Sequence, residues 1–119
     1  MFVNVSNHPS AAWSEKQLKA AHVYGEIQDV PFPNVPPTAD KQEVAVLAQK
    51  TLQQVMAFKP DCVMCSGEFT LTYELVSLLK EAGVRVVAAC SERHAQEYVD
   101  EQGRTVKTSH MDFVCFREF

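Results

Sequence analysis

The apolar residues of the chain follow two alternating patterns, one typical of strands and one typical of helices. Short apolar runs predict four β-strands, and these span residues 2–6, 26–30, 61–65 and 84–90. Between them, apolar residues recur every three or four positions, as in amphipathic helices. The predicted helices span residues 14–22, about 40–58, about 71–82 and about 92–101.

The start of the first helix carries the clearest local signal. Ser14 and Gln17 fit a capping box, and Trp13 and Leu18 stand at the positions of a hydrophobic staple. This spacing gives Trp13 a structural role, although its ring also suits stacking on a ligand. Both interpretations of Trp13 stay open at this point.

The order of strands and helices predicts a mostly parallel sheet. A tight hairpin cannot join parallel neighbours, so strands separated by helix-length segments run parallel. The apolar run 84–90 agrees, because a central parallel strand is buried on both faces. The tail from residue 104 predicts two strands or one bent strand, with Phe113 to Phe116 largely buried. We therefore expect an α/β fold: a small Rossmann-like three-layer sandwich with an antiparallel C-terminal edge.

Length and composition fit one globular domain that spans residues 1–119. The chain is 46% hydrophobic and 22% charged, and no apolar run approaches the roughly 18 residues of a membrane span. Strand-like sequence begins at Phe2, which leaves no room for a leader segment. We expect a cytoplasmic protein without membrane contact.

The four cysteines indicate reduced thiols, not disulfides or a metal site. Cys62, Cys65, Cys90 and Cys115 all stand in apolar, strand-like stretches. Cys62 and Cys65 are three residues apart on a predicted strand, so their side chains point to opposite faces. No second pair of ligands has a suitable spacing. We expect no metal and no cofactor.

Charge and glycine spacing exclude other classes of ligand. The net charge of −4 argues against a surface for duplex nucleic acid, which needs many clustered Lys and Arg side chains. The glycine fingerprints of dinucleotide and nucleoside-triphosphate sites are both missing from the sequence. A small anionic ligand remains compatible, because a few local donors suffice for it.

Three polar segments follow predicted strands, and they form the candidate site. They read SNHPSAAW from residue 6, SGEFT from residue 66 and SERH from residue 91. In open parallel sheets, ligands bind beyond the carboxyl ends of the strands. Each segment is also predicted to open a helix, whose first N–H groups are unpaired. The segments together predict an anion-binding crevice, although such residues are also common helix caps.

Three side chains in these segments carry candidate chemistry. His8, held extended by Pro9, suits a proton donor, or it is a surface imidazole. Arg93 suits a phosphate through its planar guanidinium, or it pairs with a neighbouring glutamate. Glu68 suits a ribose hydroxyl or an adenine amine, or it favours a helix start.

The same segments, with PFPNV and the closing FVCFREF, resemble small stand-alone CRISPR-associated proteins of type III loci. The resemblance extends over nearly the whole chain and includes the ring nucleases related to CARF domains. It implies a homodimer that binds cyclic oligoadenylate, such as cyclic tetra-adenylate, and cleaves it without metal. The implied activity is to switch off antiviral signalling.

The candidate residues take their roles from this resemblance and from the chemistry of RNA. A ribose 2′-hydroxyl can attack its own phosphate, so the protein needs to position it and to stabilise charge. We expect Ser10, Arg93 and helix N-termini to hold phosphates while His8 protonates the leaving 5′ oxygen. The expected ligand-binding residues are Ser6, Asn7, Trp13, Gly67, Glu68, Thr70 and Ser91.

Two other functions are compatible with the sequence. One is a binding protein that sequesters or senses the cyclic nucleotide without cleaving it. The other is an enzyme similar to nucleoside deoxyribosyltransferases, with Glu68 as the carboxylate nucleophile and Asp29 as a possible acid.

Overall fold

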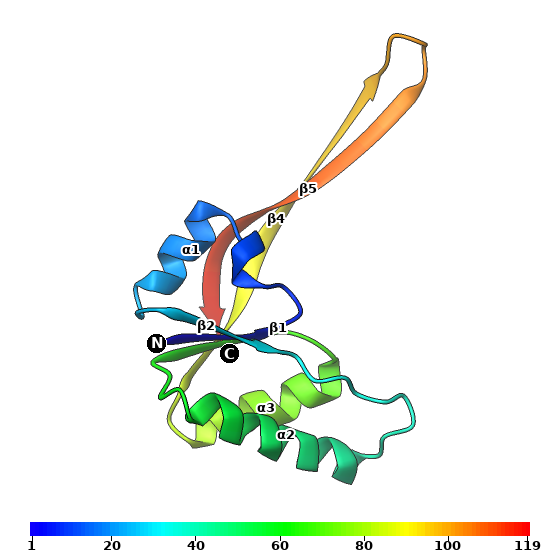
Figure 1. Cartoon of the computed structure of the whole chain (residues 1–119). Coiled ribbons are helices and arrows are strands. Elements are labelled where there is room, and N and C mark those ends of the chain that lie inside the picture. The colour runs from blue at the N-terminus through cyan, green and yellow to red at the C-terminus, as the bar shows by residue number, and fades with distance from the viewer.

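A single five-stranded sheet runs through the protein, as the computed structural model in Figure 1 shows; it describes all residues from 1 to 119. The strand order is β2-β1-β3-β4-β5, with β2, β1, β3 and β4 parallel and β5 antiparallel. The elements are β1 (Phe2–Ser6), α1 (Glu15–His22), β2 (Ile27–Pro31), α2 (Lys41–Met56), β3 (Cys62–Cys65), α3 (Phe69–Glu81), β4 (Arg85–Val99) and β5 (Thr105–Glu118). A short 3-10 turn, Ser10–Ala12, precedes α1.

Helices cover both faces of the sheet, which confirms the predicted α/β sandwich. In Figure 1, α1 lies on one face, and α2 and α3 lie on the other. The larger core joins the sheet to α2 and α3 and includes Val5, Val63 and Leu75. The smaller core lies under α1 and includes Phe2 and Met64. Two cores of unequal size therefore hold the central strands in place.

The predicted helix starts are confirmed at two positions. The side chain of Ser14 accepts a hydrogen bond from the Gln17 N–H at the start of α1. The carboxylate of Asp40 accepts one from the Glu43 N–H at the start of α2. Each cap satisfies a backbone donor that has no partner within its helix. None of the three α-helices combines the length and apolar character needed to cross a bilayer.

The prediction of a helix over residues 92–101 is wrong. These residues continue β4, which runs to Val99 and pairs with β5 in an unbroken hairpin apart from a bulge at Cys90 and Ser91. The carboxylate of Asp100 accepts from the Gln102 and Arg104 N–H groups. Gly103 has a φ of 77°, a conformation that glycine adopts readily, and it lies in the turn between β4 and β5. Because β5 offers a complete ladder of partners, tertiary pairing overrides the local helical pattern.

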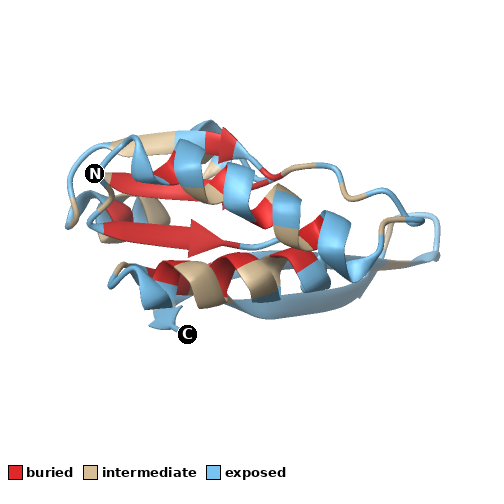
Figure 2. Ribbon diagram, turned by 90° about the horizontal axis from the view of Figure 1, so that it is seen from below, coloured by how far each residue is buried: buried red, intermediate tan, exposed pale blue.

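The hairpin projects far beyond the body of the molecule. Figure 1 shows its outer part extending away from all three helices. None of residues 91–112 is buried, and the ribbon is pale blue in Figure 2. The tail is one strand rather than two. Within it, Phe113 is buried and Phe116 partly buried, whereas Val114 and Cys115 are exposed. The expectation that Phe113 to Phe116 are all largely buried is therefore wrong. A β-bulge leaves Val114 without a partner in the β4–β5 register and interrupts the alternation of faces, so the rings of Phe113 and Phe116 pack together while Val114 and Cys115 are exposed.

Candidate functional site

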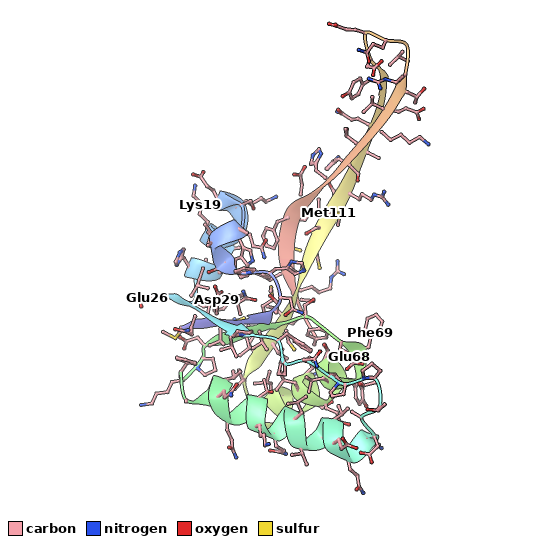
Figure 3. The ribbon with its side chains drawn as sticks, turned by 45° about the vertical axis from the view of Figure 1, so that its right-hand side comes forward. Lys19, Glu26, Asp29, Glu68, Phe69 and Met111 are labelled. Atoms are coloured by element: carbon pink, nitrogen blue, oxygen red, sulfur yellow. The ribbon has the colours of Figure 1, made fainter.

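A cleft of about 470 Å³ lies at the carboxyl edge of the parallel strands, on the α1 face of the sheet. Its walls come from the loop after β1, the end of β3 and both strands of the hairpin. The lining residues used below are His8, Trp13, Ser66, Ser91, Met111 and Phe113. Figure 3 shows Met111 on the hairpin, on the same side of the sheet as α1. The cleft has the size and position of a ligand site in an open α/β sheet.

A buried amide in β1 fixes the loop that forms one wall of the cleft. Asn4 is fully buried, and its Nδ2 donates to the carbonyl of His8 and to Asp29 Oδ1, both at 2.9 Å. Its Oδ1 accepts from Ser6 Oγ at 2.6 Å. Ser6 Oγ in turn accepts from the His8 N–H at 3.1 Å. The Asn4 side chain therefore satisfies all of its polar groups while it holds the backbone of His8.

The indole of Trp13 provides a further support for the same carbonyl. Trp13 Nε1 donates to the His8 carbonyl oxygen at 3.0 Å. Its ring lies edge-on to Phe2 at 6.1 Å and 6.3 Å from the ring of Phe116. Trp13 thus packs into the α1 core and also lines the cleft, so both interpretations of it made from the sequence remain compatible with its position.

Asp29, at the end region of β2, holds Ser10. The backbone N–H and the Oγ of Ser10 both donate to Asp29 Oδ2, at 3.1 and 3.0 Å. A phosphate at Ser10 would have to compete with this carboxylate. Ser10 is therefore placed to hold the loop shape. Asn7 is exposed next to it, and its side chain makes no hydrogen bond within the chain.

The imidazole of His8 is exposed and lines the cleft. Its backbone is held on both sides, since the N–H donates to Ser6 and the carbonyl accepts from Asn4 and Trp13. The hydrogen bonds fix where the side chain begins, and His8 is the one histidine among the residues that line the cleft.

Ser91 and Arg93 reach the site from a strand and not from a loop before a helix. Ser91 lies opposite Phe113, and Arg93 opposite Met111, in the β4–β5 register. Directly opposite residues of an antiparallel pair share a face, and Ser91, Met111 and Phe113 all line the cleft. Arg93 therefore lies at the outer rim, on the cleft face of the hairpin. It makes no ion pair with Glu92 or Glu97.

The segment after β3 divides between two surfaces. Ser66, which sequence reasoning did not assign, lines the cleft. Thr70 instead lines a separate hollow of about 500 Å³ at the starts of α2 and α3. Figure 3 places Glu68 and Phe69 beside the start of α3. The three polar segments therefore meet only in part, because the chain turns toward α3 immediately after Ser66.

Gly67 and Glu68 have clear structural roles. A Cβ on Gly67 would lie 2.5 Å from the ring of Phe32, so the glycine allows the proline-rich segment after β2 to pack on this turn. Glu68 caps α3, because its carboxylate accepts from the Thr70 and Leu71 N–H groups and from the Thr70 hydroxyl. These hydrogen bonds, led by that from the Leu71 N–H, lower the pKa of Glu68.

Thiols and metal ligands do not gather in the cleft. Burial raises the pKa of Cys62 to about 11 and that of Cys65 to about 12. The two belong to the α1 core and to the α2/α3 core respectively, which confirms that they face opposite sides of β3. No group of three or more His, Cys, Asp or Glu side chains is arranged to hold a metal ion.

The sequence reasoning did not assign several residues to the cleft, although it named Asp29 as a possible acid and expected Phe113 to be buried. Met111 and Phe113 form the hairpin wall, and Asn4 and Asp29 organise the opposite wall. The signal for Asn4 was present, since an amide in the middle of an apolar strand requires a buried partner. The signal for Met111 was absent, because its position depends on the register of a hairpin that the sequence did not reveal.

Comparison with known proteins gives a family. No curated protein and no solved structure matches the chain. One family model, described as the uncharacterized protein MJ1673 family, matches residues 1–117. Because this match covers nearly the entire sequence, the chain belongs to the MJ1673 family.

Proposed function

We propose that the protein binds cyclic oligoadenylate at the cleft and cleaves it without metal, acting as a ring nuclease that ends type III CRISPR signalling in the cytoplasm. The observation that carries this proposal is that one imidazole, His8, lines the same cleft as Ser91, with Arg93 two residues beyond Ser91 on the same face of β4. The resemblance of the sequence to such nucleases supplies the ligand.

The volume of the cleft fits only part of a cyclic oligoadenylate, so each chain would bind a portion of the ring. The cleft volume of about 470 Å³ lies within the range of single small-molecule sites, roughly 300–1,000 Å³. A ring of several nucleotides exceeds one such site. We therefore include a second copy of the chain in the proposal, because a two-fold axis would place two clefts against one symmetric ligand.

The chemistry requires little of the protein beyond position and charge. The ribose 2′-hydroxyl gives its proton to solvent water and attacks the adjacent phosphorus, the bond to the 5′ oxygen breaks, and a 2′,3′-cyclic phosphate and a 5′-hydroxyl result. In the proposal, His8 gives its proton to the leaving 5′ oxygen. Arg93 stabilises the charge that develops on the phosphate. Ser91 binds the ligand, and Ser10 positions the loop through Asp29.

Cleavage assays with cyclic tetra-adenylate in EDTA test the proposal. We expect linear products that end in a 2′,3′-cyclic phosphate, identified by mass spectrometry. His8→Ala should slow cleavage about 100-fold or more and leave binding nearly intact, since a general acid contributes roughly 10²–10⁴ in rate. His22→Ala is the matched control, because His22 is exposed at the end of α1 and does not line the cleft.

The outcomes separate the proposed function from its alternatives. A protein that neither binds nor cleaves the ring overturns the proposal. Tight binding without turnover identifies a sequestering protein instead. The transferase alternative needs the carboxylate of Glu68 free to attack, yet both of its oxygens accept hydrogen bonds from α3. Base exchange between deoxynucleosides, abolished by Glu68→Gln, would establish that enzyme.

A further inference from the structure

The outer part of the hairpin, which we name the arm, has no core of its own. The arm comprises Ser91–Val99 of β4 and Thr105–Asp112 of β5, and it leaves Tyr98, Val99 and Met111 more than half exposed. The radius of gyration is 17.2 Å, whereas a compact domain of this length has about 13–14 Å. An isolated two-stranded hairpin is marginal in water. The arm therefore lacks a neighbour that would stabilise it.

The free edge of β4 offers the place for that neighbour. β4 pairs with β3 only over Arg85–Val87, and its other edge is taken by β5. From Ala88 to Val99, the backbone N–H and C=O groups on the β3 side are unpaired. Such an edge is a template for pairing with another strand.

We propose that this edge binds a second copy of the chain, so that two β4 strands pair antiparallel about a two-fold axis at Ala95. In that register, Arg93 lies opposite the partner's Glu97, and Glu97 opposite the partner's Arg93. Neither side chain has an ion-pair partner within its own chain. The small side chain of Ala95 meets its own copy at the axis.

Other symmetric registers lack this charge complementarity. An axis at Gln96 places Arg93 opposite Val99, and an axis at His94 places it opposite Ala95. The free edge of β5 offers less. A two-fold axis pairs residues of the same face, and the face of Lys107 on β5 carries no acidic residue. On the other face, Asp112 already contacts His94 and His110 of its own chain. The β4 edge with its axis at Ala95 is therefore the register that the charges favour.

This inference rests on the proposed function, which includes a two-fold dimer, and it adds how the dimer forms. The pairing of the two β4 strands brings each arm to the partner's cleft. With the axis at Ala95, Val99 lies opposite the partner's Ser91, and the turn after Val99 lies beside the partner's cleft. The pairing also leaves Arg93 able to act. The guanidinium of Arg93 carries five N–H donors, so a carboxylate bound along one edge of its plane leaves other N–H groups free to bind a phosphate.

Charge reversal tests the register without any nucleotide. We expect a dimer in light scattering, and we expect Arg93→Glu and Glu97→Arg each to raise the dimer dissociation constant about tenfold or more, since each places like charges opposite one another twice. Mixing the two variants should restore dimers, because both facing pairs then join opposite charges. Failure of the mixture to associate, or indifference of both variants, overturns the proposed register.

A cross-link tests the axis independently of the strength of binding. In a background of Cys90→Ser and Cys115→Ser, Ala95→Cys should form a disulfide-linked dimer under mild oxidation, because directly opposite Cβ atoms lie about 4.5–5.5 Å apart. Glu92→Cys is the matched control, since its two copies would stand six residues out of register, about 20 Å apart. Equal cross-linking of both variants, or none with Ala95→Cys, overturns the axis.

These measurements fail separately from the cleavage assay. A dimer with the expected cross-link but no activity on cyclic oligoadenylate supports the pairing of the two β4 strands and overturns the nuclease function. Cleavage by a protein that stays monomeric supports the nuclease function and overturns the pairing.

Discussion

The central strands and the C-terminal hairpin belong to one sheet but have opposite surroundings. Every residue of β1 and β3 is buried. Of the 29 residues in β4 and β5, counted as 15 and 14, only Val86, Val87 and Phe113 are buried. Figure 2 shows this contrast between the body and the projecting ribbon. Helices on both faces stabilise the first pair of strands, whereas backbone pairing and one turn hold the outer hairpin.

This difference teaches where the protein has surface left for binding. The residues of β1 and β3 are buried in the core, because helices cover both faces of the sheet there. One face of the hairpin, which carries both polar and apolar residues, lines the cleft. The β4 edge of the hairpin is unpaired beyond Val87. Ordering the exposed hairpin costs conformational entropy that burial within the monomer does not offset. We therefore relate the arm to binding and the central strands to stability.

Thiol labelling should give the largest contrast between the two regions. Cys62 and Cys65 on β3 are buried with pKa values raised to about 11 and about 12 by burial, whereas Cys115 on β5 is exposed. Because only an exposed thiolate reacts, we expect Cys115 to react with iodoacetamide roughly a thousandfold faster at pH 8. Mass spectrometry of the labelled peptides measures the rates. Equal rates in the native protein would contradict the buried placement of β3, and equal rates in urea are the control.

A matched pair of valine truncations should give the next largest effect. Val63 on β3 is fully buried, and Val99 on β4 is 67% exposed. Val63→Ala removes two buried methyl groups and leaves a cavity, so we expect the free energy of unfolding to fall by about 2–3 kcal/mol. Val99→Ala should change it by less than about 0.5 kcal/mol. Urea denaturation measures both values, and similar losses would show that the arm packs against something within the monomer.

The sequence predicted the body well because its signals there are local. Alternation of apolar runs and helical spacing placed β1, β2, β3 and the three helices within a few residues of their observed bounds. Caps such as Ser14 and Asp40 marked helix starts by direct side-chain chemistry. The arm failed because the partner of β4 lies on β5, and residues 92–101 carry no local sign of that long-range register.

The sequence predicted where the candidate site lies better than it predicted which residues line it. The carboxyl edge of a parallel sheet follows from topology alone, and His8 and Ser91 do line a cleft there. Gly67, Glu68 and Thr70 lie elsewhere because Glu68 caps α3 and turns the chain away. A short polar segment does not reveal whether its side chains face a ligand or cap the following helix, since both uses favour the same residues.

A buried amide in β1 should give a smaller loss than the core truncation. Asn4→Ala leaves the His8 carbonyl with one donor fewer and Ser6 Oγ with only its longer contact of 3.3 Å to that carbonyl. We expect a loss of about 1–2 kcal/mol in the free energy of unfolding. Asn7→Ala, on an exposed neighbour without side-chain hydrogen bonds, is the control and should be nearly neutral. A neutral Asn4→Ala would show that the loop does not depend on this network.

The pH dependence of the α3 cap should be the smallest of these effects. Hydrogen bonds from the Leu71 and Thr70 N–H groups lower the pKa of Glu68 from its ordinary 4.5. A carboxyl with a lowered folded pKa stabilises the protein fully above its unfolded pKa, and that stabilisation is lost as the pH falls through the folded value. Glu68→Gln should therefore lower the unfolding temperature at pH 7, and the difference from the native chain should shrink below pH 4.5. Glu81→Gln, at the opposite end of α3, is the control because a carboxylate there opposes the helix dipole. A gap between Glu68→Gln and the native protein that stayed constant from pH 7 to pH 3 would mean that the charge of Glu68 has no part in capping α3.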